Sequence, residues 1–183
     1  MRKSVWFAAV SLVVLTGVTA VAALVGMAAY AADEKYALKV PQGLAFAEFK
    51  GFESWETVGV SYTGETIEVI LANPEMIKAY KAGVPANGKP FPDGAKMAKI
   101  HWNSKDSEDS PSPTKVQGTL HDVDLMVRDS KRFKDTGNWG YSQFTYDNAA
   151  GHYVPEGTGS DCGFSCHTIV QAKDYVFTAY GKR

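Results

Sequence analysis

The sequence predicts an α+β protein built mostly on an antiparallel β-sheet, with a few helices. Segments rich in β-branched and aromatic residues follow one another along the chain, separated by short polar or Pro/Gly-rich loops. Strands joined by short connections favour antiparallel pairing, because parallel strands need a long crossover. The length of 183 residues suggests one domain, and 45% hydrophobic with 21% charged residues are ordinary for a globular protein.

Four or five strands are expected, at residues 55–71 (one or two strands), 95–102, 116–127 and 139–146. The lead-in over residues 33–54 carries Phe46, Phe49 and Phe52. A Pro/Gly loop is expected over 83–94 and a polar loop over 103–115.

Two helices are expected. The first begins at Asn73-Pro74-Glu75, where Asn73 can cap the helix, proline suits the first turn and Glu75 favours the positive end; Gly83 closes it. Residues 128–133 can make one short helical turn. The last element, from about Cys166 to Phe177, is expected to be a helix.

The N-terminal segment predicts export. Residues 1–31 begin with Arg2 and Lys3, continue without a charged residue from Ser4 to Ala32, and contain Ala29-Tyr30-Ala31, the layout of a cleaved signal peptide. The alternative is an uncleaved membrane anchor, since the apolar run is long enough to span a bilayer. Either way, residues 32–183 form the exported domain. After cleavage 17 basic and 20 acidic residues remain, so no nucleic-acid partner is expected.

The chemistry of the chain is concentrated near its C-terminus. Cys162 and Cys166 are the two cysteines, and His167 follows the second. Cys-x-x-Cys-His is the attachment signature of a c-type haem, but here three residues separate the cysteines. In such a site the cysteines form thioethers with the haem and the histidine ligates its iron. The extra residue predicts a backbone bulge, which Gly163 permits.

Two other interpretations stay open on these residues alone. A Cys162–Cys166 disulfide is chemically possible outside the cytoplasm, but so small a loop gains little from closure entropy. A structural zinc site needs four ligands, and the remaining histidines, His101, His121 and His152, show no paired spacing.

The sequence resembles the family of cytochrome P-460 and cytochrome c′-β. The resemblance rests on segments that occur in the same order over about residues 52–180: Trp55-Glu56-Thr57-Val58-Gly59, Asn73-Pro74-Glu75, Val127–Phe133 with Gly137-Asn138-Trp139, and Lys173–Tyr180. It implies a cytochrome P-460-like fold, a periplasmic homodimer, and one haem c per chain with His167 as the single axial ligand of the iron.

The resemblance also implies further site residues. In the hydroxylamine-oxidising branch a strand lysine that follows an Asp-Gly turn is bonded to the haem; here Lys99 follows Asp93-Gly94 at that place. The other interpretation of Lys99 is an exposed strand lysine. Strand alternation puts Lys99 on one face with Met97 and His101, and Lys96 on the other. A distal acid that accepts protons is also implied, with Glu156 and Asp161 as the candidates.

Three functions follow as expectations. A redox enzyme would oxidise hydroxylamine or nitric oxide at an open iron site and pass electrons to another cytochrome. A gas-binding protein of the cytochrome c′-β type would bind nitric oxide without much chemistry. An electron carrier would need a second axial ligand, for which Met97 and His101 are the candidates.

Overall fold

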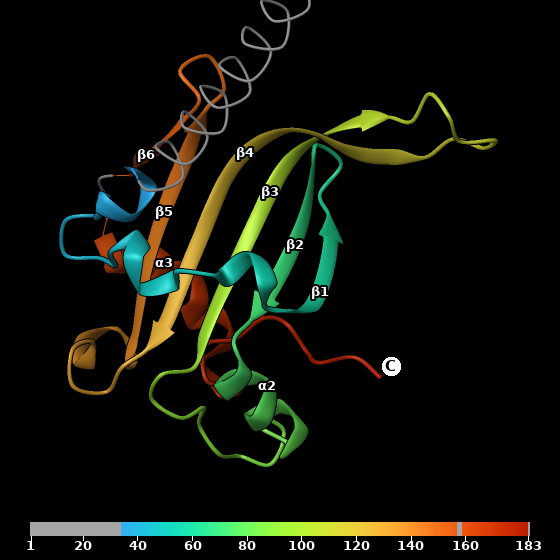
Figure 1. The fold of residues 1–183 in the computed structure, drawn as a ribbon. Coiled ribbons are helices and arrows are strands. Elements are labelled where there is room, and N and C mark those ends of the chain that lie inside the picture. Colours follow the sequence, from blue (N-terminus) through green and yellow to red (C-terminus); the bar gives the residue numbers. More distant parts are fainter. Residues whose placement is uncertain (1–33, 157–158, 183) are drawn as a thin grey trace, which may run out of the picture.

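The computed structural model describes residues 34–156 and 159–182, and its centre is one antiparallel sheet (Figure 1). Six strands lie side by side in chain order, each paired with the next. They are β1 (Glu56–Tyr62), β2 (Thr66–Ala72), β3 (Lys96–Asp106), β4 (Lys115–Arg128), β5 (Trp139–Asp147) and β6 (His152–Pro155). The predicted α+β class with a mostly antiparallel sheet is confirmed.

The helices are short. The α-helices in the described part of the chain are α2 (Pro74–Lys81) and α3 (Gly159–His167). Single turns of 3₁₀-helix occupy Lys35–Ala37, Phe46–Phe49, Phe52–Ser54 and Lys134–Thr136, and a longer 3₁₀ segment covers Thr168–Lys173.

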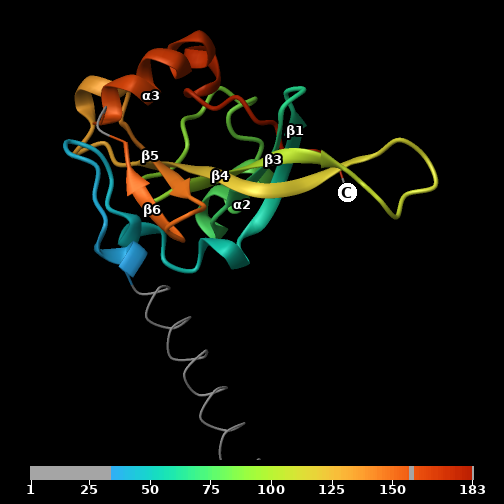
Figure 2. The same cartoon turned by 90° about the horizontal axis from the view of Figure 1, so that it is seen from above.

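Both faces of the sheet are covered, because strand side chains alternate between two apolar clusters. Met97 and Met126 face a cluster that α2 and the C-terminal segment complete, whereas Ala98 and Leu125 face a second cluster. Figure 2 shows α3 on one side of the sheet and the lead-in segment on the other. The lead-in fills the second cluster with three fully buried rings, Phe46, Phe49 and Phe52.

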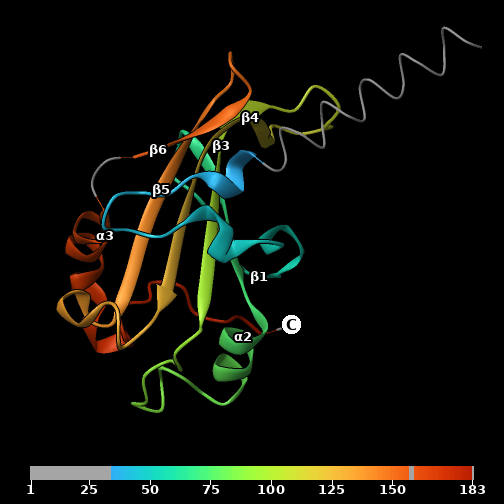
Figure 3. The ribbon, with the colours of Figure 1, turned by 60° about the vertical axis from the view of Figure 1, so that its left-hand side comes forward.

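The structure has strands in two places where the sequence did not predict them. β3 and β4 continue into the polar segment expected as a loop over 103–115, and their hairpin projects beyond the neighbouring strands at the opposite end of the sheet from α2 (Figures 1 and 3). Strand pairing there satisfies the backbone without an apolar face, so composition alone did not reveal it. β6 was also not predicted, because it is only four residues long.

The C-terminal helix lies earlier than predicted. The expected span was Cys166 to Phe177, but α3 ends at His167 and the following 3₁₀ turns end at Lys173. Asp174 and Tyr175 have φ angles of 50° and 62°, and left-handed backbone terminates a helix. The remaining chain runs past α2, where the carbonyl of Thr178 accepts a hydrogen bond from the Tyr80 hydroxyl (2.8 Å), to β1, where the Tyr180 hydroxyl donates one to Glu56 (2.5 Å).

The expected signal peptide or anchor over residues 1–31 lies outside the described residues. Within residues 34–156 and 159–182, no helix combines the length and apolar character needed to cross a bilayer.

Asn73 joins the helix to the sheet, and its replacement should be costly. Its buried side chain accepts hydrogen bonds from the backbone N–H groups of Met76 (3.1 Å) and Lys96 (3.0 Å), and donates one to the carbonyl of Gly94 (2.8 Å). A lost N-cap costs about 1 kcal/mol and each further buried bond about 1 kcal/mol. Asn73→Ala should therefore lower the free energy of unfolding by about 2–3 kcal/mol in denaturant titrations. The exposed Lys78→Ala on the same helix should change it by less than about 0.5 kcal/mol.

Candidate functional site

A cavity of about 450 Å³ lies between the sheet and the C-terminal part of the chain. It brings together residues singled out from the sequence, among them Lys99 from β3, and Cys166 and His167 from the end of α3. The remaining lining is mixed apolar and polar, with Ser61, Glu68, Ile70, Met97, Asp124, Leu125, Met126, Tyr141, Val176, Phe177 and Thr178.

Strand register explains why polar residues collect on this face. Lys99 on β3 pairs with Asp124 on β4, and His101 pairs both with Glu68 on β2 and with Asp122 on β4. Alternate residues of a strand share a face, and directly opposed residues have Cβ atoms about 5 Å apart. Two successive cross-strand rows therefore put five ionisable groups on one face of the sheet.

His167 has a defined tautomer. Its Nδ1 lies 2.6 Å from the backbone carbonyl oxygen of Tyr175. Because a carbonyl can only accept, Nδ1 must carry the proton and Nε2 keeps its lone pair. Burial lowers the pKa of the His167 imidazole, so the ring is neutral near pH 7. A neutral imidazole whose second nitrogen is held by a hydrogen bond is the usual form of a metal-ligating histidine.

The carbonyl that orients His167 is itself fixed by tertiary contacts. Asp174, the preceding residue, accepts a hydrogen bond from the backbone N–H of Phe91 (2.7 Å) and lies 3.5 Å from the guanidinium of Arg128. The rings of Tyr141 and Phe177 each lie 4.9 Å from the imidazole, centroid to centroid. These contacts hold the imidazole from several sides.

The two cysteines lie on one regular helix. Both are in α3 with exposed, free thiols, and a spacing of four residues puts them on the same helix face. A second cavity of about 250 Å³ is lined by Cys162 and Cys166 together. The expected bulge between them is absent, because the extra residue is taken up by the helical repeat. Gly163 instead serves packing: a Cβ there would lie 2.5 Å from that of Tyr141 on β5.

Lys99 is paired with a carboxylate that the sequence did not single out. Its Nζ lies 2.8 Å from Oε2 of Glu68, and its side chain is 35% exposed. Burial disfavours the charged form of Glu68, but hydrogen bonds from Lys99 and Ser61 outweigh it, so the pKa of the Glu68 carboxyl lies below its ordinary value. Lys99 is therefore a lysine of the cavity wall, as strand alternation predicted.

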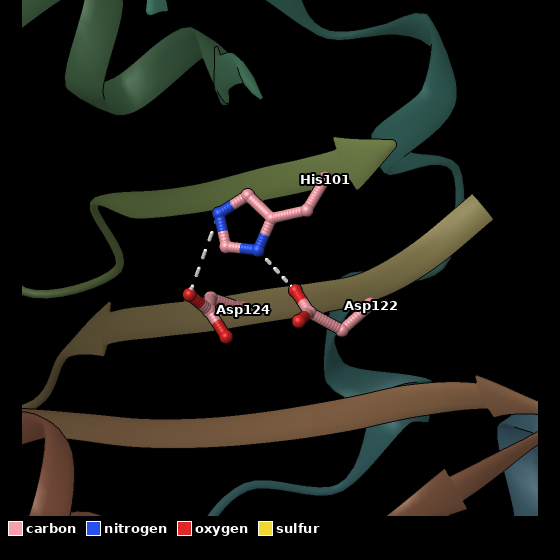
Figure 4. Close-up of side chains that lie close together, drawn as sticks. All are labelled: His101, Asp122 and Asp124. Atoms are coloured by element: carbon pink, nitrogen blue, oxygen red, sulfur yellow. Dashed lines mark hydrogen bonds and ion pairs between the residues drawn. The ribbon is translucent and has the colours of Figure 1, made fainter. Parts of the chain in front are cut away.

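A second group of side chains extends from the cavity (Figure 4). His101 Nδ1 is hydrogen-bonded to Asp122, and His101 Nε2 lies 3.8 Å from Asp124 Oδ2 and 3.7 Å from Glu68 Oε1. Donor atoms of His101, Asp122 and Asp124 lie within 4.8 Å of one another, a spacing that could also hold a metal ion. The Nδ1 atom of His101 makes the hydrogen bond to Asp122, whereas its Nε2 atom is buried and has no hydrogen-bond partner.

These groups have different proton affinities. Burial, together with the negative charge of Asp122, raises the pKa of the Asp124 carboxyl to about 6. Burial lowers the pKa of the His101 imidazole, but its hydrogen bond to Asp122 and the nearby carboxylates outweigh this and the pKa is raised. Burial raises the pKa of the Asp122 carboxyl, but its hydrogen bonds from His101 and His121 outweigh this effect, and the pKa lies below its ordinary value. Asp124 is therefore the acid that changes charge near neutral pH.

Glu156 and Asp161, the acids expected from the sequence, do not line the cavity. Glu156 accepts a hydrogen bond from the Thr145 hydroxyl (2.6 Å), and Asp161 is an exposed residue of α3. Asp124 and Glu68 were missed, although charged residues at alternate positions of an otherwise apolar strand, as in Asp122-x-Asp124, were a readable signal.

A Cys-x₃-Cys-His helix that presents a neutral histidine to a cavity of mixed polarity is the arrangement expected of one class of protein, the c-type cytochromes. A model of the family Cytochrome P460 matches residues 49–178. This match spans more than half of the sequence, and the chain belongs to the cytochrome P460 family. No curated protein matches the chain.

Family membership implies a haem c cofactor, and the residues present fit one. Cys166 and His167 lie at one wall of the cavity, as attachment and iron ligation require. The Tyr141 hydroxyl, also in the wall, is buried without a hydrogen-bond partner. A buried hydroxyl left unpaired costs free energy, so the site is suited to a bound group that supplies a polar contact.

Proposed function

We propose that this protein is an exported mono-haem cytochrome that binds hydroxylamine or nitric oxide at an open iron site and oxidises the bound molecule. One observation carries the proposal: a single cavity has Cys166 and His167 on one wall and Lys99 and Asp124 on the sheet. The first pair can attach and ligate a haem, and the second can tune it and accept protons.

In this proposal Cys162 and Cys166 form the thioethers and His167 Nε2 ligates the iron. The haem, when bound, supplies the redox centre and an iron position open to a small ligand. The hydrogen bond from His167 Nδ1–H to Tyr175 orients the imidazole and raises the basicity of Nε2.

Lys99 and Asp124 have separate roles in the proposed reaction. Lys99 is the residue that would be bonded to the haem edge, and Glu68, whose Oε2 lies 2.8 Å from the amine, would hold the side chain in place. Asp124 accepts protons from the bound substrate, because its carboxylate lines the cavity and its pKa of about 6 suits proton transfer near neutral pH. Glu156 and Asp161 remain the alternatives inferred from the sequence.

The proposed setting follows from the N-terminal sequence and the family resemblance. We infer that the protein acts in the periplasm as a homodimer, either after signal-peptide cleavage at Ala31 or held by an uncleaved anchor. An electron-accepting cytochrome would reoxidise the haem.

A second candidate function is nitric-oxide binding without turnover. The apolar part of the cavity wall favours it, since Ile70, Met97, Leu125, Met126, Val176 and Phe177 can exclude water from a bound gas. An electron carrier would need Met97 or His101 as a second axial ligand; Met97 lines the cavity, whereas His101 is engaged with Asp122.

Covalent haem attachment is the first test. Protein expressed with a haem-attachment system should keep a haem-stained band on a denaturing gel, and the Cys162→Ser/Cys166→Ser variant should lose it. Ser165→Ala, an exposed change between the two cysteines, is the matched control and should keep the band. A chain without haem and with a 162–166 disulfide would refute the proposal.

The role of Lys99 is tested by the haem absorption spectrum and the hydroxylamine-oxidising activity of a variant that lacks its amine. Lys99→Ala should give the spectrum of an ordinary c-type haem and abolish hydroxylamine oxidation, while nitric oxide still binds. Lys96→Ala is the control, because Lys96 points to the other face, where its amine donates to the carbonyl of Glu48 (2.5 Å). An unchanged spectrum in Lys99→Ala would favour the gas-binding function instead.

Asp124 should give the reaction a characteristic pH dependence. Its raised pKa of about 6 means that the carboxylate, the form that accepts a proton, is lost as the pH falls through 6. Lys99 bonded to haem would no longer oppose protonation of Asp124, so hydroxylamine oxidation should rise with pH through about 6 or somewhat above and then level off. Asp124→Asn should lower the rate about a hundredfold or more without weakening nitric-oxide binding. Glu156→Gln and Asp161→Asn are the controls and should oxidise hydroxylamine at nearly the wild-type rate. If one of them loses most of this activity while Asp124→Asn stays active, that residue is the proton acceptor instead of Asp124.

A further inference from the structure

The three side chains of Figure 4, His101, Asp122 and Asp124, belong to a row of polar groups between the cavity and the protein surface. Asp124 lines the cavity, His101 Nε2 lies 3.8 Å from it, and His101 Nδ1 is hydrogen-bonded to Asp122 Oδ1. The other oxygen of Asp122, Oδ2, lies 2.6 Å from Nδ1 of His121. The side chain of His121 is 49% exposed, whereas that of Asp122 is only 5% exposed. Carboxylates and imidazoles thus alternate from the cavity to solvent.

A β-bulge makes the last contact possible. His101 pairs with Asp122 while the next residue of β3, Trp102, pairs with Leu120, so His121 is an extra residue on β4. In a regular strand, His121 and Asp122 would point to opposite faces of the sheet. A bulge re-aims side chains, and bulges are frequent next to active sites. Here it brings the His121 imidazole onto a carboxylate that is otherwise buried.

The hydrogen-bonding capacity of these groups suits proton transfer. Asp122 as a carboxylate can only accept, so His101 donates its Nδ1 proton to Asp122, and the neutral form of the ring has a lone pair on Nε2. That lone pair faces the carboxyl of Asp124 in a buried setting without a hydrogen bond. The 3.8 Å between Nε2 and Asp124 Oδ2 is longer than a hydrogen bond, so proton transfer requires these two side chains to move closer together.

The surrounding charges support a proton carried on His101. The groups facing it are Glu68 on β2, Lys99 on its own strand, and Asp122 and Asp124 on β4. Gln143 on β5 donates a hydrogen bond to Asp122 (3.4 Å). Three carboxylates against one lysine stabilise an imidazolium at His101 during transfer.

We propose that His101, Asp122 and His121 form a proton-transfer chain between Asp124 in the haem cavity and solvent. This rests on the proposed haem in that cavity and deepens the proposed function. The oxidation of one hydroxylamine to nitric oxide breaks its N–H and O–H bonds, and each proton released is matched by one electron that leaves through the haem to an acceptor cytochrome. The chain carries those protons away: Asp124 passes its proton to His101 Nε2, and His101 Nδ1 releases one to Asp122. Asp122 gives that proton to His121 Nδ1 once the exposed His121 ring has released its own Nδ1 proton to water.

The test does not need hydroxylamine turnover. One electron is injected into the ferric holoprotein by flash excitation of a ruthenium photosensitiser, and proton uptake in weakly buffered solution is followed with a pH-indicator dye. Reduction adds negative charge in the cavity, so Asp124 should draw a proton inward along the same chain. His121→Ala should slow uptake by about tenfold or more at an unchanged rate of haem reduction, and added imidazole should restore it.

Two further variants make the result specific. Asp122→Asn should slow uptake in the same way without rescue by imidazole, since the missing group is buried. His152→Ala, an exposed histidine on β6, should behave as wild type. The proposal is overturned if wild type takes up no proton, if His121→Ala and Asp122→Asn take it up at the wild-type rate, or if a metal chelator alters wild-type uptake, which would make the cluster a metal site. A protein that shows the chain but does not oxidise hydroxylamine would refute only the proposed function.

Discussion

The register of β3 between β2 and β4 is the constraint on which the rest of the structure depends. Both faces of the sheet are buried against apolar clusters, and the face toward α3 also carries the ionisable groups of the cavity. A slip of one residue would exchange the two faces of β3, moving Lys99 and His101 among the phenylalanine rings of the lead-in. Burying such groups without partners costs several kcal/mol. The packing that stabilises the fold therefore also decides which residues line the cavity.

The opposite wall of the cavity depends on contacts between segments distant in sequence. α3 lies close against β5 because Gly163 has no side chain to collide with Tyr141. Beyond α3, Asp174 is held by Phe91 and Arg128, and this fixes the Tyr175 carbonyl that orients His167. The hydrogen bond from His167 to the Tyr175 carbonyl therefore depends on Phe91 and Arg128, neither of which lines the cavity.

The sequence predicted the fold class and much of the cavity, for identifiable reasons. Alternation in 95–102 was enough to put Lys99 with Met97, since both strand faces there carry distinct residue types. Asp124 and Glu68 could not be placed, because their position beside Lys99 depends on inter-strand register, which a single sequence does not specify. The end of α3 was misplaced because its termination depends on the left-handed backbone of Asp174 and Tyr175, which tertiary contacts hold. The His121 bulge has no sequence signal at all.

The electrostatics of the cavity link the proposed roles of Lys99 and Asp124. The Lys99 ammonium lowers the proton affinity of Asp124 and opposes protonation of His101, while it favours the charged form of Glu68. An amine consumed in a bond to the haem loses that charge. Asp124 would then bind protons more tightly, the His101 imidazolium would be easier to form, and Glu68 would lose its strongest partner. One covalent bond would therefore strengthen both the proton acceptor and the first member of the proposed proton-transfer chain, because Lys99 pairs directly with Asp124 and lies one cross-strand row from His101.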